Sequence, residues 1–227
     1  MPTETGLLVL ADIGGYTRFM KLHRISLAHA EETTGRLLEA VVDAVPDLEL
    51  VEIEGDAAFL YTRENHGVSN AVESAAAMYR SFHSEQARLA SRNRCPCDAC
   101  HQLGGLTVKF VAHVGEVATQ TIRDRTKLVG LDVILVHRML KASVPVPEYV
   151  LMTEAMYEQA DPALRKQARE IEEELEGIGS SRLYFLAVED LGAERPAPPP
   201  AASALAKLGE TTGIVLRGLP RMLSRRA

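Results

Sequence analysis

Cysteine is scarce in this sequence, and long apolar runs are missing. The 227 residues include three cysteines, all between positions 95 and 100, which does not suit the disulfide framework of a secreted domain. There is no run of eighteen apolar residues, and the start MPTETG lacks the basic-then-apolar pattern of a signal peptide. We therefore expect a cytoplasmic protein without a membrane span.

The overall composition is that of a globular chain with one substantial core. Hydrophobic residues make up 46% of the sequence and charged residues 25%, and the net charge is −6. An acidic chain does not attract the phosphate backbone of nucleic acids, so we expect no nucleic-acid partner.

The composition changes near Gly192, and this change divides the chain into three parts. We assign residues 1–190 to one domain, residues 191–203 to a Pro/Ala-rich linker and residues 204–227 to a short basic tail. The tail has five basic residues and one acidic residue, which leaves the rest of the chain with a charge near −10. This tail suits contact with a protein partner or an acidic membrane surface, or else it is a disordered extension.

Apolar periodicity predicts strands that alternate with amphipathic helices. Strands are expected at 7–11, 106–114 and 149–153, helices at 26–45, 68–89 and 131–140, and a closing hairpin at 169–188. We interpret Gly115 as a turn from which residues 116–122 return as a strand, and Thr153 as the cap of a short helix. This order predicts an α+β sandwich around a mostly antiparallel sheet.

Two of the strands end in acidic turns about forty residues apart. LVLADIGGYT passes from a buried strand through Asp12 and two glycines into a helix, and VEIEGDAAFLY forms a tight hairpin at Gly55 and Asp56. Carboxylates at two strand ends would place hard oxygen ligands side by side, as Mg²⁺ requires, and the N–H groups of residues 14–17 suit phosphate. The alternative reading is structural, because aspartate is common in turns.

Four motifs in this order resemble those of the class III nucleotidyl cyclases, the adenylyl and guanylyl cyclases. LADIGGYT matches the D-I-x-G-[FY]-T signature, EGDAAFLY the G-D hairpin, KFVAHVGEV the strand ending in H-x-G, and VGLDVILVHRM the G-x-x-V-N-x-A-x-R helix. The resemblance covers roughly residues 6–190 and is closest to a bacterial cyclase-like branch with a cysteine cluster. It implies the cyclase homology domain: α+β, ferredoxin-like at its centre, with a mostly antiparallel sheet flanked by helices.

The resemblance also implies roles for individual residues and an assembly. Transferred to this sequence, the family's motifs imply metal ligands at Asp12, Ile13 and Asp56, phosphate contacts at Gly14, Gly15, Tyr16 and Thr17, base contacts at Glu52 and Lys127, and a catalytic Arg138. The cofactor would be Mg²⁺ or Mn²⁺, two per site in an active enzyme. The partners would be a nucleoside triphosphate and a second copy of the chain, because family catalysis occurs at a dimer interface.

The nucleotide base is not determined by these residues. A carboxylate at Glu52 can accept hydrogen bonds from guanine, but the family's usual pairings, Lys with Asp or Glu with Cys, are not reproduced with Lys127. The alternative interpretation is that Glu52 is an exposed residue without a role in base binding, on a strand whose side chains alternate between the two faces.

Two groups that stabilise the family's transition state are replaced by isoleucine. The position of the Asn holds Ile134, and the position of the phosphate-binding Lys falls near Ile178. Loss of one preorganised donor at a developing charge costs about 10²–10³ in rate. We therefore expect slow cyclisation or none.

A cluster of soft ligands, CPCDACH, precedes the H-x-G strand. Cys95, Cys97, Cys100 and His101 suit a tetrahedral Zn²⁺ that would act as a structural clip, with His83 or His113 as alternative fourth ligands. Without metal, the same residues would be a cytosolic thiol cluster.

Three functions follow from these observations. The first is a cyclase-like signalling protein that binds Mg-nucleoside triphosphate with weak or absent turnover. The second is an active nucleotidyl cyclase that makes a 3′,5′-cyclic nucleotide, in which other groups replace the missing donors. The third is a zinc-clipped, non-catalytic interaction module.

Overall fold

Two long neighbouring strands, β1 (Thr3–Gly14) and β4 (Thr107–Ile122), form the centre of the fold. The computed structural model describes residues 3–22, 27–63, 67–92 and 102–197. The described strands make one eight-stranded sheet in the order β2-β3-β1-β4-β6-β8-β7, and β5 pairs with β4 outside this path. The pairing of β4 with β6 is parallel, and the other pairs are antiparallel. The α+β fold with a mostly antiparallel sheet is confirmed.

The remaining elements follow the predicted order closely. The other strands are β2 (Glu49–Glu54), β3 (Ala57–Thr62), β5 (Arg125–Val129), β6 (Tyr149–Thr153), β7 (Arg169–Leu175) and β8 (Gly179–Ala187). The helices are α1 (Tyr16–Leu22), α2 (Leu27–Asp43), α3 (Gly67–Arg92), α5 (Leu131–Met139), α6 (Glu154–Gln159) and α7 (Pro162–Gln167), with 3₁₀ turns at Leu103–Gly105 and Val188–Leu191. None of these helices is long and apolar enough to cross a membrane.

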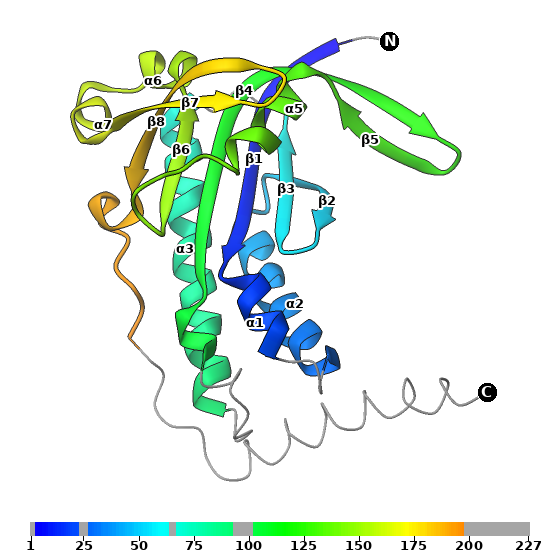
Figure 1. Cartoon of the computed structure of the whole chain (residues 1–227), viewed down its shortest axis with the longest axis vertical. Coiled ribbons are helices and arrows are strands. Elements are labelled where there is room, and N and C mark those ends of the chain that lie inside the picture. Colours follow the sequence, from blue (N-terminus) through cyan, green and yellow to red (C-terminus); the bar gives the residue numbers. More distant parts are fainter. Residues whose placement is uncertain (1–2, 23–26, 64–66, 93–101, 198–227) are drawn as a thin grey trace.

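Both faces of the central strands are buried, which explains why their sequences are nearly continuous apolar runs. Leu7, Val9 and Ala11 of β1 pack on one face, against a core that includes residues of α2 and α3. Leu8 and Leu10 lie on the other face, where α5 and the β7–β8 pair complete a second core. Figure 1 shows α3 running along the length of the central strands, and the β4–β5 hairpin projecting away from the sheet.

The interpretation of Gly115 as a turn is wrong. β4 runs through this glycine without interruption, and Gly115 pairs with Gly6 of β1. The chain reverses later, at Arg123, which has a positive φ of 58°, and Asp124, before β5 returns. The glycine is needed for a different reason, since a Cβ at position 115 would collide with the side chain of Asp132 at the start of α5. A tertiary contact, not a turn, therefore accounts for this residue.

Thr153 occupies the N-cap position of α6, but its hydroxyl makes no capping hydrogen bond. Instead, Thr153 Oγ1 lies 3.0 Å from Nδ1 of the buried His113, whose Nε2 is 3.3 Å from Asp132 Oδ1. The other oxygen of Asp132 accepts a hydrogen bond from the backbone N–H of Glu116, at 2.6 Å. These contacts fix the start of α5 against β4 and β6.

A second buried polar cluster joins α3 to the segment that follows the last strand. His83 Nε2 contacts Glu148 at 2.8 Å, and Gln86 donates to the carbonyls of Leu103 and Leu106. The guanidinium of Arg195 contacts His83 and Gln86 at 3.0 and 2.8 Å. The first residues of the predicted linker, 191–203, therefore pack on the domain. The predicted tail, 204–227, lies outside the described residues.

Candidate functional site

The two predicted metal-binding aspartates lie side by side where strand ends meet. Asp12 is on β1, two residues before it ends, and Asp56 follows Gly55 in the turn between β2 and β3. Antiparallel pairing sets Asp12 opposite Ala57, and the backbone N–H of Ile13 donates to the carbonyl oxygen of Asp56, at 3.1 Å. The buried, apolar side chain of Ile13 leaves only its backbone carbonyl as a metal ligand.

The charges of this pair act on each other. Burial, and then the neighbouring charge of Asp12, raise the pKa of the Asp56 carboxyl. Burial, Asp12 and Glu173 raise the pKa of Tyr149 to about 12, so this phenol stays neutral beside the pair. A divalent cation would relieve this crowding of negative charge, and carboxylate oxygens are the ligands that Mg²⁺ prefers. The donor set therefore fits a hard cation, which it would bind through one oxygen or more of each aspartate.

A third charged group, Lys109, contacts Asp12 and is not among the site residues predicted from the sequence. Its Nζ is 3.2 Å from Asp12 Oδ2 and donates to the carbonyl oxygen of Leu140, at 3.0 Å. Asp12 and Lys109 are paired residues of β1 and β4, so both side chains point to the same face of the sheet. The sequence does indicate such a contact, because a lysine within the apolar strand LTVKFVAHV is unusual unless its charge is paired.

The predicted phosphate-binding turn, Gly14 to Thr17, continues directly from Asp12. Gly15 has a positive φ of 84°, which favours glycine, and α1 begins at Tyr16. A Cβ on Gly14 would collide with the hydroxyl of Thr107 on β4. Gly15 is thus favoured by the backbone conformation and Gly14 by the neighbouring Thr107 side chain, and Gly15 and Thr17 are exposed.

Helix α5 presents the other predicted half of the site. Arg138 makes an ion pair of 2.6 Å with Glu176, in the turn between β7 and β8. Ile134, at the position of the family's Asn, is 50% exposed, and Ile178 packs against the second core. His137 lies 3.1 Å from Glu54 of β2, which ties α5 to the hairpin that carries Asp56.

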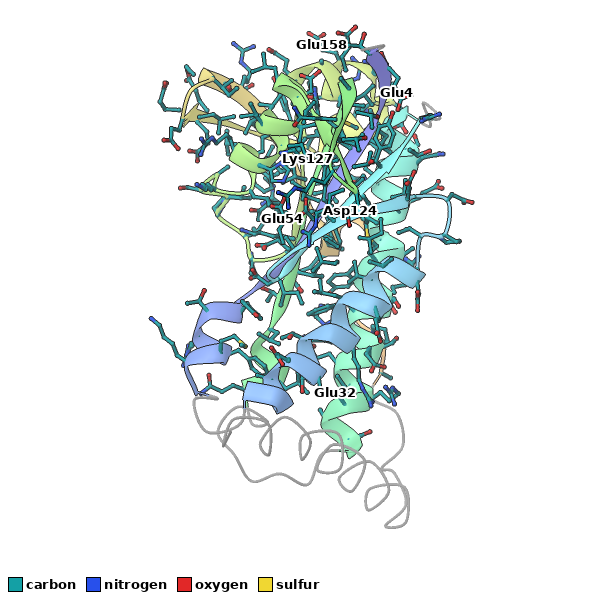
Figure 2. All side chains as sticks on the ribbon, turned by 90° about the vertical axis from the view of Figure 1, so that its right-hand side faces the viewer. Glu4, Glu32, Glu54, Asp124, Lys127 and Glu158 are labelled. Atoms are coloured by element: carbon teal, nitrogen blue, oxygen red, sulfur yellow. The ribbon has the colours of Figure 1, made fainter. Side chains whose placement is uncertain are left out.

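The predicted base-contacting residues lie on two strands that touch each other, β2 and β5. Glu52 is exposed and pairs with Phe59, and Lys127 is exposed and pairs with Gln120. Figure 2 shows Lys127 and Asp124 of the hairpin and Glu54 of β2 on the face turned toward the viewer. A role for Glu52 and Lys127 in base binding remains a prediction.

Comparison with known proteins identifies the family of this chain. Residues 34–149 match the model of a family described as "Protein of unknown function (DUF2652)". A relative from Mycobacterium tuberculosis, "Uncharacterized protein Rv2561/Rv2562", is 38% identical over 151 residues, which cover 66% of this chain and 71% of the relative. The chain belongs to the DUF2652 family.

Solved structures similar to this DUF2652 protein are class III cyclase domains. The guanylate cyclase domain of RhGC from Catenaria anguillulae, in complex with GTP, is 16% identical with a TM-score of 0.57, over 82% of this chain and 98% of that chain. The adenylyl cyclase CyaB from P. aeruginosa is 12% identical with a TM-score of 0.54, over 88% and 100%. At these identities the likeness establishes the cyclase fold and leaves the activity open.

The proposed zinc ligands Cys95, Cys97, Cys100 and His101 lie outside the described residues. Within the described ranges, no group of three or more His, Cys, Asp and Glu side chains is arranged to hold a metal ion. The two alternative fourth ligands, His83 and His113, are buried and already contact Glu148 and Thr153. The zinc site therefore remains a prediction from the sequence.

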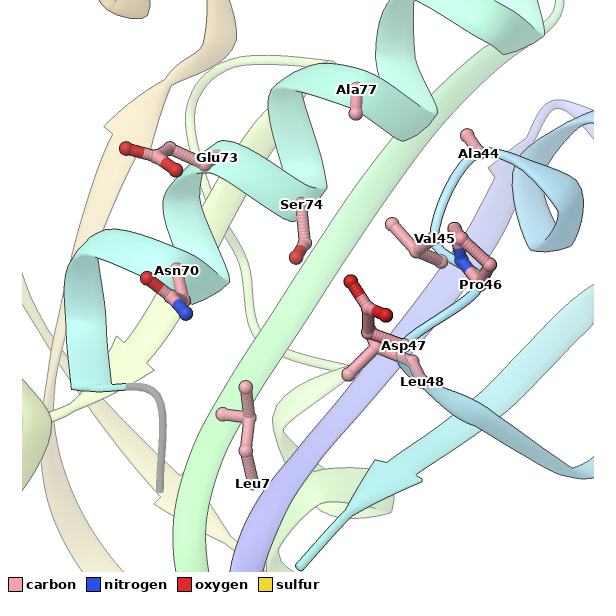
Figure 3. A pocket seen from close by; sticks show the side chains of 10 residues that line it. All are labelled: Leu7, Ala44, Val45, Pro46, Asp47, Leu48, Asn70, Glu73, Ser74 and Ala77. Carbon is pink, nitrogen blue, oxygen red and sulfur yellow. The ribbon is translucent and has the colours of Figure 1, made fainter. Parts of the chain in front are cut away.

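A separate pocket of about 260 Å³ lies on the other face of the sheet. It is bounded by the loop between α2 and β2 and by α3, and Leu7 of β1 lies at its base. Figure 3 shows Asp47 and Ser74 pointing toward one another across it. None of the predicted site residues lines this pocket, so it is distinct from the aspartate pair.

Proposed function

We propose that this DUF2652 protein is a cyclase-like signalling protein that binds Mg-nucleoside triphosphate at the interface of a homodimer, with weak or absent cyclase turnover. The observation that carries the proposal is the adjacent pair Asp12 and Asp56, at the strand ends of a cyclase fold. The pair would hold one or more Mg²⁺ or Mn²⁺ ions, which would neutralise charge on the phosphates. The exposed turn from Gly14 to Thr17 would contact the phosphates through its backbone N–H groups.

Weak turnover is supported by the residues that α5 presents. The exposed isoleucine at position 134 has no group that can donate a hydrogen bond to a developing charge, whereas the Asn of the class III cyclases can donate one. Arg138 is held within its own chain by Glu176, and this ion pair must open before Arg138 can reach a nucleotide bound by a second copy. The metal-binding half is therefore more complete than the half that would stabilise the transition state.

A homodimer is supported by the surface around α5. Within the part of the chain that the structure describes, the exposed large apolar side chains gather on β2, on the end of β4 and on α5: Leu50, Ile53, Ile122, Leu131 and Ile134. The same surface carries exposed Glu49, Glu52 and Glu54 on β2, and exposed Arg123, Arg125 and Lys127 on the hairpin. A surface with both charge signs and an apolar centre suits pairing with its own copy about a two-fold axis.

Calorimetric titration with ATP, GTP, CTP and UTP, each with Mg²⁺ or Mn²⁺, tests nucleotide binding. We expect binding of at least one nucleotide by the wild type and loss of binding in Asp12→Asn and Asp56→Asn. Glu158→Gln, which removes an exposed acid from α6, is the matched control and should bind normally. No binding of any of the four nucleotides by correctly folded wild type would overturn the proposal.

Turnover and assembly need separate measurements. Mass spectrometry of the same mixtures would detect a cyclic product, and a product that disappears in Asp12→Asn would establish the active-cyclase alternative. Light scattering after size exclusion should give twice the chain mass for the wild type and a monomer for Ile122→Glu. Ala163→Glu, on the exposed surface of α7, is the control for added charge, and a monomeric wild type would contradict the dimer.

A further inference from the structure

Lys109 is held at the aspartate pair by acceptors from two directions. Its side chain is 23% exposed, and that of Asp12, its ion-pair partner, is 19% exposed. The second acceptor, the carbonyl oxygen of Leu140, is at the C-terminal end of α5, where the helix dipole favours a cation. A largely buried ammonium group needs such partners, because leaving it unpaired in an apolar environment is costly.

The ammonium group also influences the other aspartate. Its positive charge partly offsets the repulsion between Asp12 and Asp56, and thus lowers the pKa of the Asp56 carboxyl against the larger effects that raise it. The three side chains together carry a net charge of −1 when all are ionised. That is one negative charge fewer than the two aspartates alone would offer an incoming cation.

From these contacts we infer that Lys109 is a built-in counter-cation of the Asp12–Asp56 pair, which competes with a divalent ion for the carboxylate of Asp12. The inference rests on the proposed function, because it takes the aspartate pair as a metal site. The ammonium group repels a divalent ion bound to the same carboxylate and competes with it for Asp12 Oδ2. Lys109 therefore lowers the metal affinity of the pair.

The experiment is a titration of the full-length protein with Mn²⁺ alone, with free Mn²⁺ measured by electron paramagnetic resonance. Lys109→Met keeps the length of the side chain without its charge, and we expect Mn²⁺ to bind this variant about tenfold or more tightly than the wild type. Lys109→Arg keeps the charge and should bind about as weakly as the wild type. Lys166→Met, on exposed α7, is the matched control for net charge and should leave the affinity unchanged.

Thermal unfolding gives a second measurement that does not depend on activity. Without metal, Lys109→Met should melt at a lower temperature than the wild type, because Asp12 loses its partner. Saturating Mn²⁺ should raise its melting temperature by more than it raises that of the wild type, since tighter binding stabilises the folded state more. A variant that melts cooperatively has folded and can be titrated.

The outcomes separate this inference from the proposed function. Equal or weaker Mn²⁺ binding by folded Lys109→Met, together with Mn²⁺ binding by the wild type, would overturn the role of Lys109 and leave the metal site standing. Failure of both wild type and Lys109→Met to bind Mn²⁺ or any nucleotide would overturn the proposed function, and the inference with it.

Discussion

Replacing Asp56 with asparagine should stabilise the metal-free protein while abolishing metal binding. Burial and the charge of Asp12 both disfavour the ionised Asp56, and both raise its pKa in the folded state. At neutral pH the wild type therefore folds with an unfavourable charge that it could avoid only by taking up a proton. Asparagine has nearly the same shape and carries no charge, so Asp56→Asn removes this cost.

The size of the effect follows from the partial exposure of the site. Water screens a charge that is only partly buried, and Lys109 offsets some of the repulsion, so we expect a gain of about 0.5–1 kcal/mol. For a chain of this size, that gain corresponds to a rise of about 1–4 °C in melting temperature. Asp12→Asn should show no such gain, because it also removes the ion-pair partner of Lys109.

The pH dependence of this gain has a definite sign. Because the folded-state pKa of Asp56 is raised, its protonated form is the one that favours folding, and this contribution is lost as the pH rises through the raised value. The advantage of Asp56→Asn should therefore be full at pH 7, shrink on acidification, and vanish below the ordinary pKa of an aspartate. Calorimetric melting in the presence of a chelator, from pH 7 down to pH 4, measures it. A lower melting temperature for the folded variant at pH 7 would refute the reasoning.

Three further predictions concern other parts of the chain. Ile134→Asn should raise the yield of cyclic nucleotide at least tenfold by mass spectrometry, because it restores a donor at the developing charge; an unchanged yield would mean that this position does not limit turnover. Arg195→Ala should lower the melting temperature by about 2–8 °C, since it removes the two hydrogen bonds that Arg195 makes to buried His83 and Gln86; exposed Lys166→Ala should not. Freshly purified, reduced protein should contain about one zinc per chain by elemental analysis, and Cys97→Ser should melt earlier; absence of zinc would favour the thiol cluster.

Local patterns in the sequence were enough to predict most of the elements and the aspartate pair. The helical period of residues 26–45 predicted α2, whose Leu37 and Val41 are fully buried. The motifs around Asp12 and Asp56 predicted two strand ends that meet, because an antiparallel pair brings the end of one strand opposite the start of the other. Such features depend on residues that are close in sequence, so the spacing of apolar and acidic residues along the chain predicts them.

Contacts between distant residues could be decided only by the tertiary structure. Gly115 was misread as a turn because its small size is required by Asp132, 17 positions later, and a local pattern does not reveal that neighbour. The partners of Lys109, Arg138 and Arg195 are likewise set by sheet order and helix packing. Residue types and their spacing are enough to tell which residues carry charge and where strands end. The packing of α5 and α3 on the sheet sets which of those charges meet, because charge pairing depends on distance in space.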